Sequence, residues 1–201
     1  VEGARPGAGA DALVDRLGVH EHAGVEESCG IERALEGGEG PQGLGGVDDA
    51  QQLGAGPAVA VLAHRVLEVV DFLSIGTNDL SQYTMAADRM QGELAELLSP
   101  WQPAVLSMIR ETCRGGEATG KPVGVCGEAG GDPLMALVLV GLGVKSLSMA
   151  PGKVNAVRAA LRLHDFDTCR QMANFAVDAR TATGAREAVL NLADPVLKDL
   201  L

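Results

Sequence analysis

The sequence predicts an α/β fold with a parallel sheet, and three observations support this. Three short apolar segments, VDFLSI, PVGVCGE and VKSLSMA, have the composition of strands buried on both faces. Longer segments with helical periodicity separate them, so strands and helices alternate along the chain. Polar residues gather where each predicted strand ends. Alternation favours parallel pairing with right-handed crossovers, and parallel α/β folds bind ligands at the carboxyl edge of the sheet.

The predicted elements follow one another from Pro57 onward. The apolar periodicity of AVAVLAHRVLEVV predicts a helix before the first strand, and QGELAELLSP and PAVLSMIRETCRGGEATG predict two helices after it. The next helix, DPLMALVLVGLG, is expected to start at Asp132, because aspartate caps a first turn and proline fits its first position. PGKVNAVRAALRLH predicts a helix after the third strand, and the remaining residues predict helix and tail.

Residues 1–56 differ in composition from the rest of the chain. They contain 14 of the 27 glycines, and 11 acidic residues against three basic ones. ADALVDRLGV and IERALEG have the periodicity of short amphipathic helices, but the segment has little large apolar surface to offset the entropy of ordering. We predict an acidic, Gly-rich leader at 1–56, disordered or out of frame, with a small independent domain as the alternative. The folded domain is predicted at 57–201.

Composition narrows the function classes. No segment approaches 18 uncharged apolar residues, so no transmembrane helix is expected. A net charge of −11 argues against a nucleic-acid or anionic-membrane surface. The four cysteines are widely spaced and form no CxxC pair, which favours reduced thiols in a cytoplasm over a zinc site or disulfides. The histidines share no motif and are interpreted as solvated: His20, His22, His64 and His164.

The first predicted strand runs into SIGTNDLSQYT, which is rich in small polar groups. Asp79 either caps the following helix or binds a hard cation, and Asn78 either forms a turn or contacts a ligand. Mg²⁺ suits this position, since it usually takes one or two protein carboxylates plus substrate oxygens. Arg89 is either a surface arginine or a bidentate clamp for a phosphate or carboxylate.

The second predicted strand ends at Cys126, Gly127 and Glu128. Cys126 is either an inert buried thiol or, at a strand end, a proton donor or nucleophile. Glu128 either orients that thiol or caps the helix behind GGDP. The third strand ends at Ser148, Met149 and Ala150.

Four segments carry a family resemblance: DFLSIGTNDLSQYTMAADR, SPWQPAVLSMI, GKPVGVCGEAGGDP and GLGVKSLSMAP. In this order they resemble the C-terminal barrel of enzyme I of the bacterial sugar phosphotransferase system, the phosphoenolpyruvate–protein phosphotransferase. The resemblance runs from about Pro57 to about Leu192. It implies the last three βα units of a (β/α)8 TIM-type barrel that binds phosphoenolpyruvate (PEP) in the cytoplasm.

The resemblance also implies roles for particular residues. Asp79 corresponds to a Mg²⁺ ligand, Asn78 to a contact with the phosphate of PEP, and Arg89 to an arginine that stabilises the moving phosphoryl group. Cys126 corresponds to the general acid that protonates C3 of the enolate as pyruvate forms. The implied partners are the phosphocarrier protein HPr, through domains outside this sequence, and a second copy in a homodimer.

The sequence departs from the family pattern at the leader. A second metal carboxylate is expected two residues before a proline, and Ala55 stands there in GAGPA. The phosphohistidine and HPr-docking domains are also missing from this sequence. Two functions therefore remain open: phosphoryl transfer from PEP to a protein histidine, or an inactive fragment that serves only assembly or dimerisation. A dikinase-type enzyme would need an ATP-grasp domain, which this sequence lacks.

Overall fold

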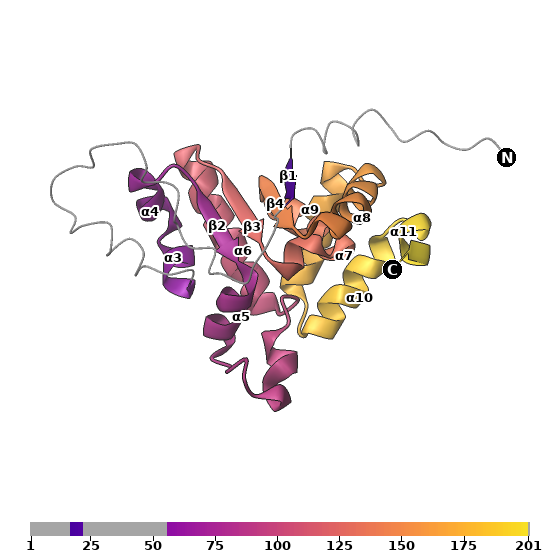
Figure 1. Cartoon of the computed structure of the whole chain (residues 1–201), viewed down its shortest axis with the longest axis horizontal. Coiled ribbons are helices and arrows are strands. Elements are labelled where there is room, and N and C mark those ends of the chain that lie inside the picture. The colour runs from indigo at the N-terminus through magenta and orange to yellow at the C-terminus, as the bar shows by residue number, and fades with distance from the viewer. Residues whose placement is uncertain (1–16, 22–55, 201) are drawn as a thin grey trace.

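A computed structural model describes residues 17–21 and 56–200 as an α/β structure with one parallel sheet (Figure 1). The sheet has four strands in the order β1-β4-β3-β2, and every neighbouring pair is parallel. The strands span Gly18–Glu21 (β1), Leu73–Gly76 (β2), Val123–Cys126 (β3) and Ser146–Met149 (β4). The predicted α/β class and parallel pairing are therefore confirmed, while closure into a TIM-type barrel stays a prediction.

Helices connect the strands and extend the chain beyond the sheet. α3 and α4 lie beside β2 at one end of the sheet, and α8 to α11 lie beyond β4 (Figure 1). The helices before and between the strands are α3 (Pro57–Val61), α4 (Ala63–Val69), α5 (Thr77–Met85), the 3₁₀ helix η1 (Gly92–Leu98), α6 (Pro103–Thr119), the 3₁₀ helix η2 (Glu128–Gly131) and α7 (Pro133–Gly141). Those after β4 are α8 (Pro151–Arg162), α9 (Phe166–Asp178), α10 (Ala182–Leu192) and α11 (Pro195–Leu200).

The two faces of the sheet differ in chemistry. Ile75, Val125 and Leu147 lie in register across β2, β3 and β4, and all three are buried in the core. The alternate positions carry small residues, with Ser74 opposite Gly124 and Gly124 opposite Ser146. Because alternate strand residues point to opposite faces, one face packs the apolar core and the other is small and polar.

The predicted start of α7 and the predicted end of α6 are confirmed, because neighbouring residues fix them. Asp132 caps α7: its carboxylate accepts hydrogen bonds from the backbone N–H groups of Leu134 (2.9 Å) and Met135 (3.3 Å). The glycine-rich end of α6 closes at Gly120, whose φ of +69° is a left-handed conformation that favours glycine. α7 is buried along almost its whole length, which explains its continuous apolar sequence.

Several boundary predictions were wrong. The helix predicted over AVAVLAHRVLEVV is two helices, because Leu62 leaves helical geometry between α3 and α4. QGELAELLSP forms a 3₁₀ helix instead of an α-helix. ADALVDRLGV was interpreted as helical, yet Gly18 and Val19 begin β1, which pairs with β4. Parallel pairing with an existing strand outweighs weak helical periodicity here. IERALEG lies outside the described residues, so the division at residue 56 stays a prediction.

His164 was wrongly interpreted as solvated. It is 5% exposed, and both ring nitrogens have backbone partners: Nδ1 lies 2.8 Å from the Ala160 carbonyl oxygen, and Nε2 accepts a 3.0 Å hydrogen bond from the Asp194 N–H. These two bonds tie the end of α8 to the start of α11. His64 is exposed, as predicted. The side chain of His20 is not described, and His22 lies outside the described residues.

No helix within residues 17–21 and 56–200 has the length and apolar character needed to cross a bilayer.

The contact between α7 and α9 yields a stability prediction. A Cβ added at Gly141 would overlap the carbonyl oxygen of Cys169 and lie 2.9 Å from the Cβ of Ala173. We expect Gly141→Ala to lower the free energy of unfolding by at least about 2 kcal/mol, since backbone must shift to relieve the overlap. Urea denaturation measures the change.

Gly152→Ala is the matched control, because a Cβ at this helical glycine meets nothing within 4 Å. We expect it to leave stability unchanged or to raise it by up to about 1 kcal/mol. Equal stability of the two variants would contradict the close approach of α7 and α9.

Candidate functional site

The candidate site lies at the carboxyl edge of the sheet, where β2 and β3 end side by side. Gly76, the last residue of β2, is in register with Cys126, the last residue of β3. α5 begins directly at Thr77, with no loop between strand and helix. The polar residues of SIGTNDLSQYT therefore occupy the first turns of a helix that starts at the sheet edge, as the sequence predicted.

Asp79 and Arg89 are brought together in this site. The Asp79 Oδ1 and Arg89 Nη1 atoms lie 3.6 Å apart, with the aspartate side chain 40% and the arginine side chain 60% exposed. α5 ends at Met85, and the next residue, Ala86, has a φ of +50°, which turns the chain so that Arg89 returns toward the first turn of the helix. At this distance and exposure the pair is loose and contributes less than about 1 kcal/mol, so both groups remain available to a ligand.

Asp79 does not cap α5. Gly76 occupies the N-cap position and provides no side-chain acceptor, while Asp79 lies within the first turn. Asn78 is exposed beside it. The first N–H groups of α5 thus have no side-chain cap, and a helix start of this kind favours an anion.

Thr77 also belongs to this site, although no motif in the sequence marks it. Its side chain is 1% exposed, and its hydroxyl makes no hydrogen bond among the described residues. Ser81, one turn later, is also 1% exposed with an unpartnered hydroxyl. Buried hydroxyls usually have partners, so the Thr77 hydroxyl, at the start of the helix, is a candidate donor to a polar ligand.

Cys126 is placed next to this helix start, but its thiol is buried. The residue is 6% exposed, and its Sγ donates a 3.4 Å hydrogen bond to the carbonyl oxygen of Ile75. Gly127 follows with a φ of +97°, and a Cβ there would lie 3.6 Å from the Thr77 hydroxyl. The backbone after Cys126 therefore approaches Thr77 closely, which places the ends of β2 and β3 around one small volume.

Glu128 does not cap the helix behind GGDP. It begins η2 and is exposed, and the cap of α7 is Asp132. Its role in orienting the Cys126 thiol stays a prediction.

The donor set for a metal ion is small. Within the described part of the chain, no group of three or more His, Cys, Asp or Glu side chains is placed to hold a metal ion. Asp79 supplies one carboxylate, and Ala55, at the position expected for a second, lies outside the described residues. Because Mg²⁺ completes its shell with water and substrate oxygens, this set fits a substrate-bound Mg²⁺ better than an independent metal site.

Comparisons with known proteins match this region. The model of the PEP-binding domain of PEP-utilising enzymes matches residues 53–166, more than half of the chain. The chain is 48% identical over 132 residues to a phosphoenolpyruvate-protein phosphotransferase of Streptomyces coelicolor and 41% identical over 143 residues to one of Latilactobacillus sakei. It is 45% identical over 130 residues to a multiphosphoryl transfer protein of Xanthomonas campestris.

These matches cover 66%, 71% and 65% of this chain, but 24%, 24% and 16% of the relatives. The chain thus spans about a quarter or less of the length of these proteins. The resemblance predicted from the four motifs is confirmed, and the matched region includes Asn78, Asp79, Arg89 and Cys126. The chain belongs to the PEP-utilising enzyme family and carries sequence of its PEP-binding domain.

Proposed function

We propose that this chain is part of a phosphoenolpyruvate–protein phosphotransferase, enzyme I of a sugar phosphotransferase system. The reaction transfers the phosphoryl group of PEP to a protein histidine and releases pyruvate. One arrangement carries the proposal: an uncapped helix start with an orphan buried hydroxyl lies at the sheet edge, and an arginine loosely paired with Asp79 stands beside it, all within the matched PEP-binding region.

The phosphate of PEP is proposed to bind at the start of α5. The free N–H groups of the first turn, the Thr77 hydroxyl and the Asn78 amide are all hydrogen-bond donors. Arg89 adds a positive charge from the other side of Asp79. Phosphoryl transfer depends mainly on positioning the phosphoryl group and neutralising its charge, and hydrogen-bond donors and a cation do both.

Asp79 is proposed to hold Mg²⁺ together with oxygens of PEP. A bound Mg²⁺ would neutralise charge on the phosphoryl oxygens. An Arg89 released from Asp79 would be free to contact the phosphoryl group, which the 3.6 Å separation of the pair permits at little cost.

Cys126 is proposed to protonate the product. When the P–O bond of PEP breaks, its electron pair stays with the leaving oxygen, and pyruvate leaves as its enolate. Formation of pyruvate requires one proton at C3, which the thiol can donate before solvent returns a proton to the thiolate. The thiol must first turn from the Ile75 carbonyl, to which it donates in this structure.

The finer expectations belong to the same proposal: a TIM-type barrel completed by further strands, transfer to HPr through other domains, homodimerisation, cytoplasmic location and a role in sugar transport.

The alternative function is assembly without catalysis. It is favoured by the outer edge of β2, which pairs with no described strand, and by the nearby exposed side chains of Val69 (51%) and Phe72 (38%).

Ligand-dependent melting of the whole chain separates the two functions. We expect PEP with Mg²⁺ to raise the melting temperature. At a hundredfold excess over its dissociation constant, a ligand of the folded state adds about 2.7 kcal/mol to the free energy of unfolding. Circular dichroism measures the shift. In Asp79→Asn, the effect of adding Mg²⁺ to PEP should be lost, while Asp88→Asn, on an exposed turn of the same segment, should behave as wild type. A melting temperature that PEP does not change would favour the assembly function.

Thr77→Val tests the phosphate position without disturbing the packing. Valine keeps the branched shape and removes a buried hydroxyl that has no described partner, so stability should stay the same or rise by up to about 1 kcal/mol. Affinity for PEP should fall about tenfold or more, because a hydrogen bond to a charged group is lost. Isothermal titration calorimetry and urea denaturation give the two values.

Ser81→Ala is the control for this variant, since it removes the next orphan hydroxyl, one turn farther from the helix start. It should leave PEP affinity unchanged. Wild-type affinity in Thr77→Val would contradict the proposed phosphate position.

A further inference from the structure

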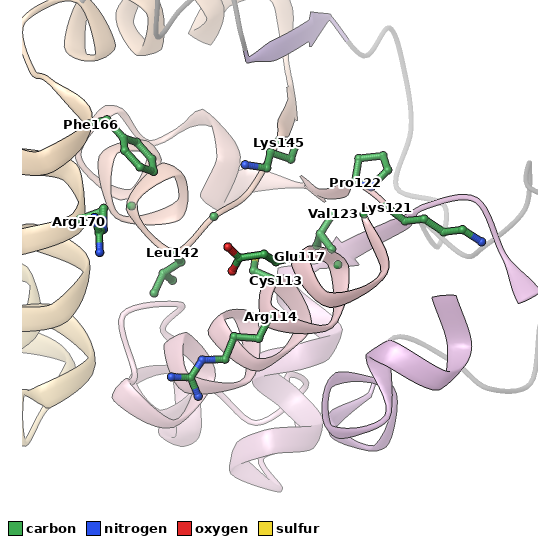
Figure 2. A pocket seen from close by; sticks show the side chains of 14 residues that line it. Cys113, Arg114, Glu117, Lys121, Pro122, Val123, Leu142, Lys145, Phe166 and Arg170 are labelled. Carbon is green, nitrogen blue, oxygen red and sulfur yellow. The ribbon is translucent and has the colours of Figure 1, made fainter. Parts of the chain in front are cut away.

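A cavity lies at the opposite edge of the sheet from the candidate site. It has a volume of about 570 Å³ and is lined at the amino ends of β3 and β4, where Val123 begins one strand and Lys145 precedes the other. The C-terminal half of α6, the turn after α7 and the start of α9 complete its walls (Figure 2). We call it the amino-edge cavity. Its volume lies in the usual range for small-molecule sites.

Most of the charged groups around this cavity already have partners. Arg114 pairs with Glu111 at 2.9 Å, and Arg170 lies 3.9 Å from Asp167. The Lys121 ammonium donates a 2.7 Å hydrogen bond to the carbonyl oxygen of Val70. In Figure 2 the side chains of Arg114 and Lys121 extend away from the cavity.

Lys145 and Glu117 are different. Both line the cavity, both are exposed, and neither side chain has a hydrogen bond or ion pair among the described residues. Figure 2 shows the Lys145 ammonium and the Glu117 carboxylate directed into the same space from different walls. Two opposite charges thus face one cavity without meeting each other.

The floor of the cavity is apolar. Cys113 (7%), Val123 (2%) and Leu142 (9%) are buried beneath it, and Phe166 stands at its rim with 43% of its surface exposed. Burial raises the pKa of the Cys113 thiol to about 12, and the positive charge of Lys145 partly opposes this rise. The ammonium is therefore near the floor, and the thiol stays protonated and unreactive at neutral pH.

Two helices end at this cavity. α6 ends at Thr119, two residues after Glu117, and α7 ends at Gly141, which also lines the cavity. The C-terminal end of a helix carries partial negative charge from its last carbonyl groups. The end of α6, beside Glu117, therefore adds to the attraction of that carboxylate for an ammonium group.

We propose that the amino-edge cavity binds a small zwitterion, an α-amino acid with an apolar side chain. The carboxylate of the ligand pairs with Lys145, its ammonium group pairs with Glu117, and its side chain covers Leu142 and Phe166. Binding is reversible and involves no chemical step. Because the cavity and the candidate site lie at opposite edges of the sheet, the amino acid and PEP do not compete for the same residues.

The test compares amino acids with analogues that lack one charge, using the whole chain. L-Leucine, L-methionine and L-phenylalanine are titrated by isothermal titration calorimetry, beside 3-phenylpropionate and phenethylamine. At least one amino acid should bind, and saturating amounts should raise the melting temperature by several degrees. Each phenylalanine analogue should bind at least about tenfold more weakly than L-phenylalanine, because it loses one charge-assisted hydrogen bond.

Variants identify the two charges. Lys145→Gln and Glu117→Gln should each weaken amino-acid binding about tenfold or more, while Arg114→Gln, whose side chain points away from the cavity, should bind as wild type. Far-UV circular dichroism checks that each variant folds. If a variant does not fold, the comparison of phenylalanine with its analogues on the unaltered chain tests the proposal instead.

Three results would overturn the proposal. The first is no detectable binding of any of the three amino acids at about 10 mM, because a dissociation constant above this concentration is too weak for a specific site. The second is 3-phenylpropionate binding as tightly as L-phenylalanine, which would reveal a simple anion site at Lys145. The third is unchanged binding in folded Lys145→Gln and Glu117→Gln.

Discussion

The parallel pairing of β2, β3 and β4 is the constraint on which the rest of the structure depends. Ile75, Val125 and Leu147 form one buried row across the three strands, and a shift of one residue would turn this row to the opposite face. The same register places Gly76 beside Cys126. The apolar row therefore decides which polar groups meet at the carboxyl edge, although none of its members takes part in the proposed chemistry.

The two edges of the sheet differ in electrostatic character, and this difference follows from how the helices connect to the strands. At the carboxyl edge, α5 starts directly after β2 and directs its uncapped N–H groups toward the candidate site. At the amino edge, α6 and α7 end near the cavity and contribute partial negative charge. In a parallel sheet each crossover helix runs opposite to the strands, so the two edges differ in this way by construction.

Three residues of the candidate site are close together along the chain, whereas Cys126 joins them from the neighbouring strand. Asn78, Asp79 and Arg89 lie within one strand–helix–turn unit, so a local motif specifies their arrangement. Thr77 was missed as a site residue, because nothing local shows that a hydroxyl will be buried without a partner. The burial of His164 was missed for a related reason: its partner, the N–H of Asp194, is 30 residues away. The role of Gly18–Glu21 as a strand was also missed, since its partner β4 lies far along the chain.

By itself, the sequence determined the α/β class, the order of strands and helices after Pro57, the Asp132 cap and the family, because periodicity, capping and motif spacing act over a few residues. Only the tertiary structure decided the order of the strands in the sheet, the orphan hydroxyl of Thr77 and the unpaired charges of Lys145 and Glu117. These features depend on distances between segments that are far apart in the sequence. The packing of the whole core sets such distances, and no local pattern encodes them.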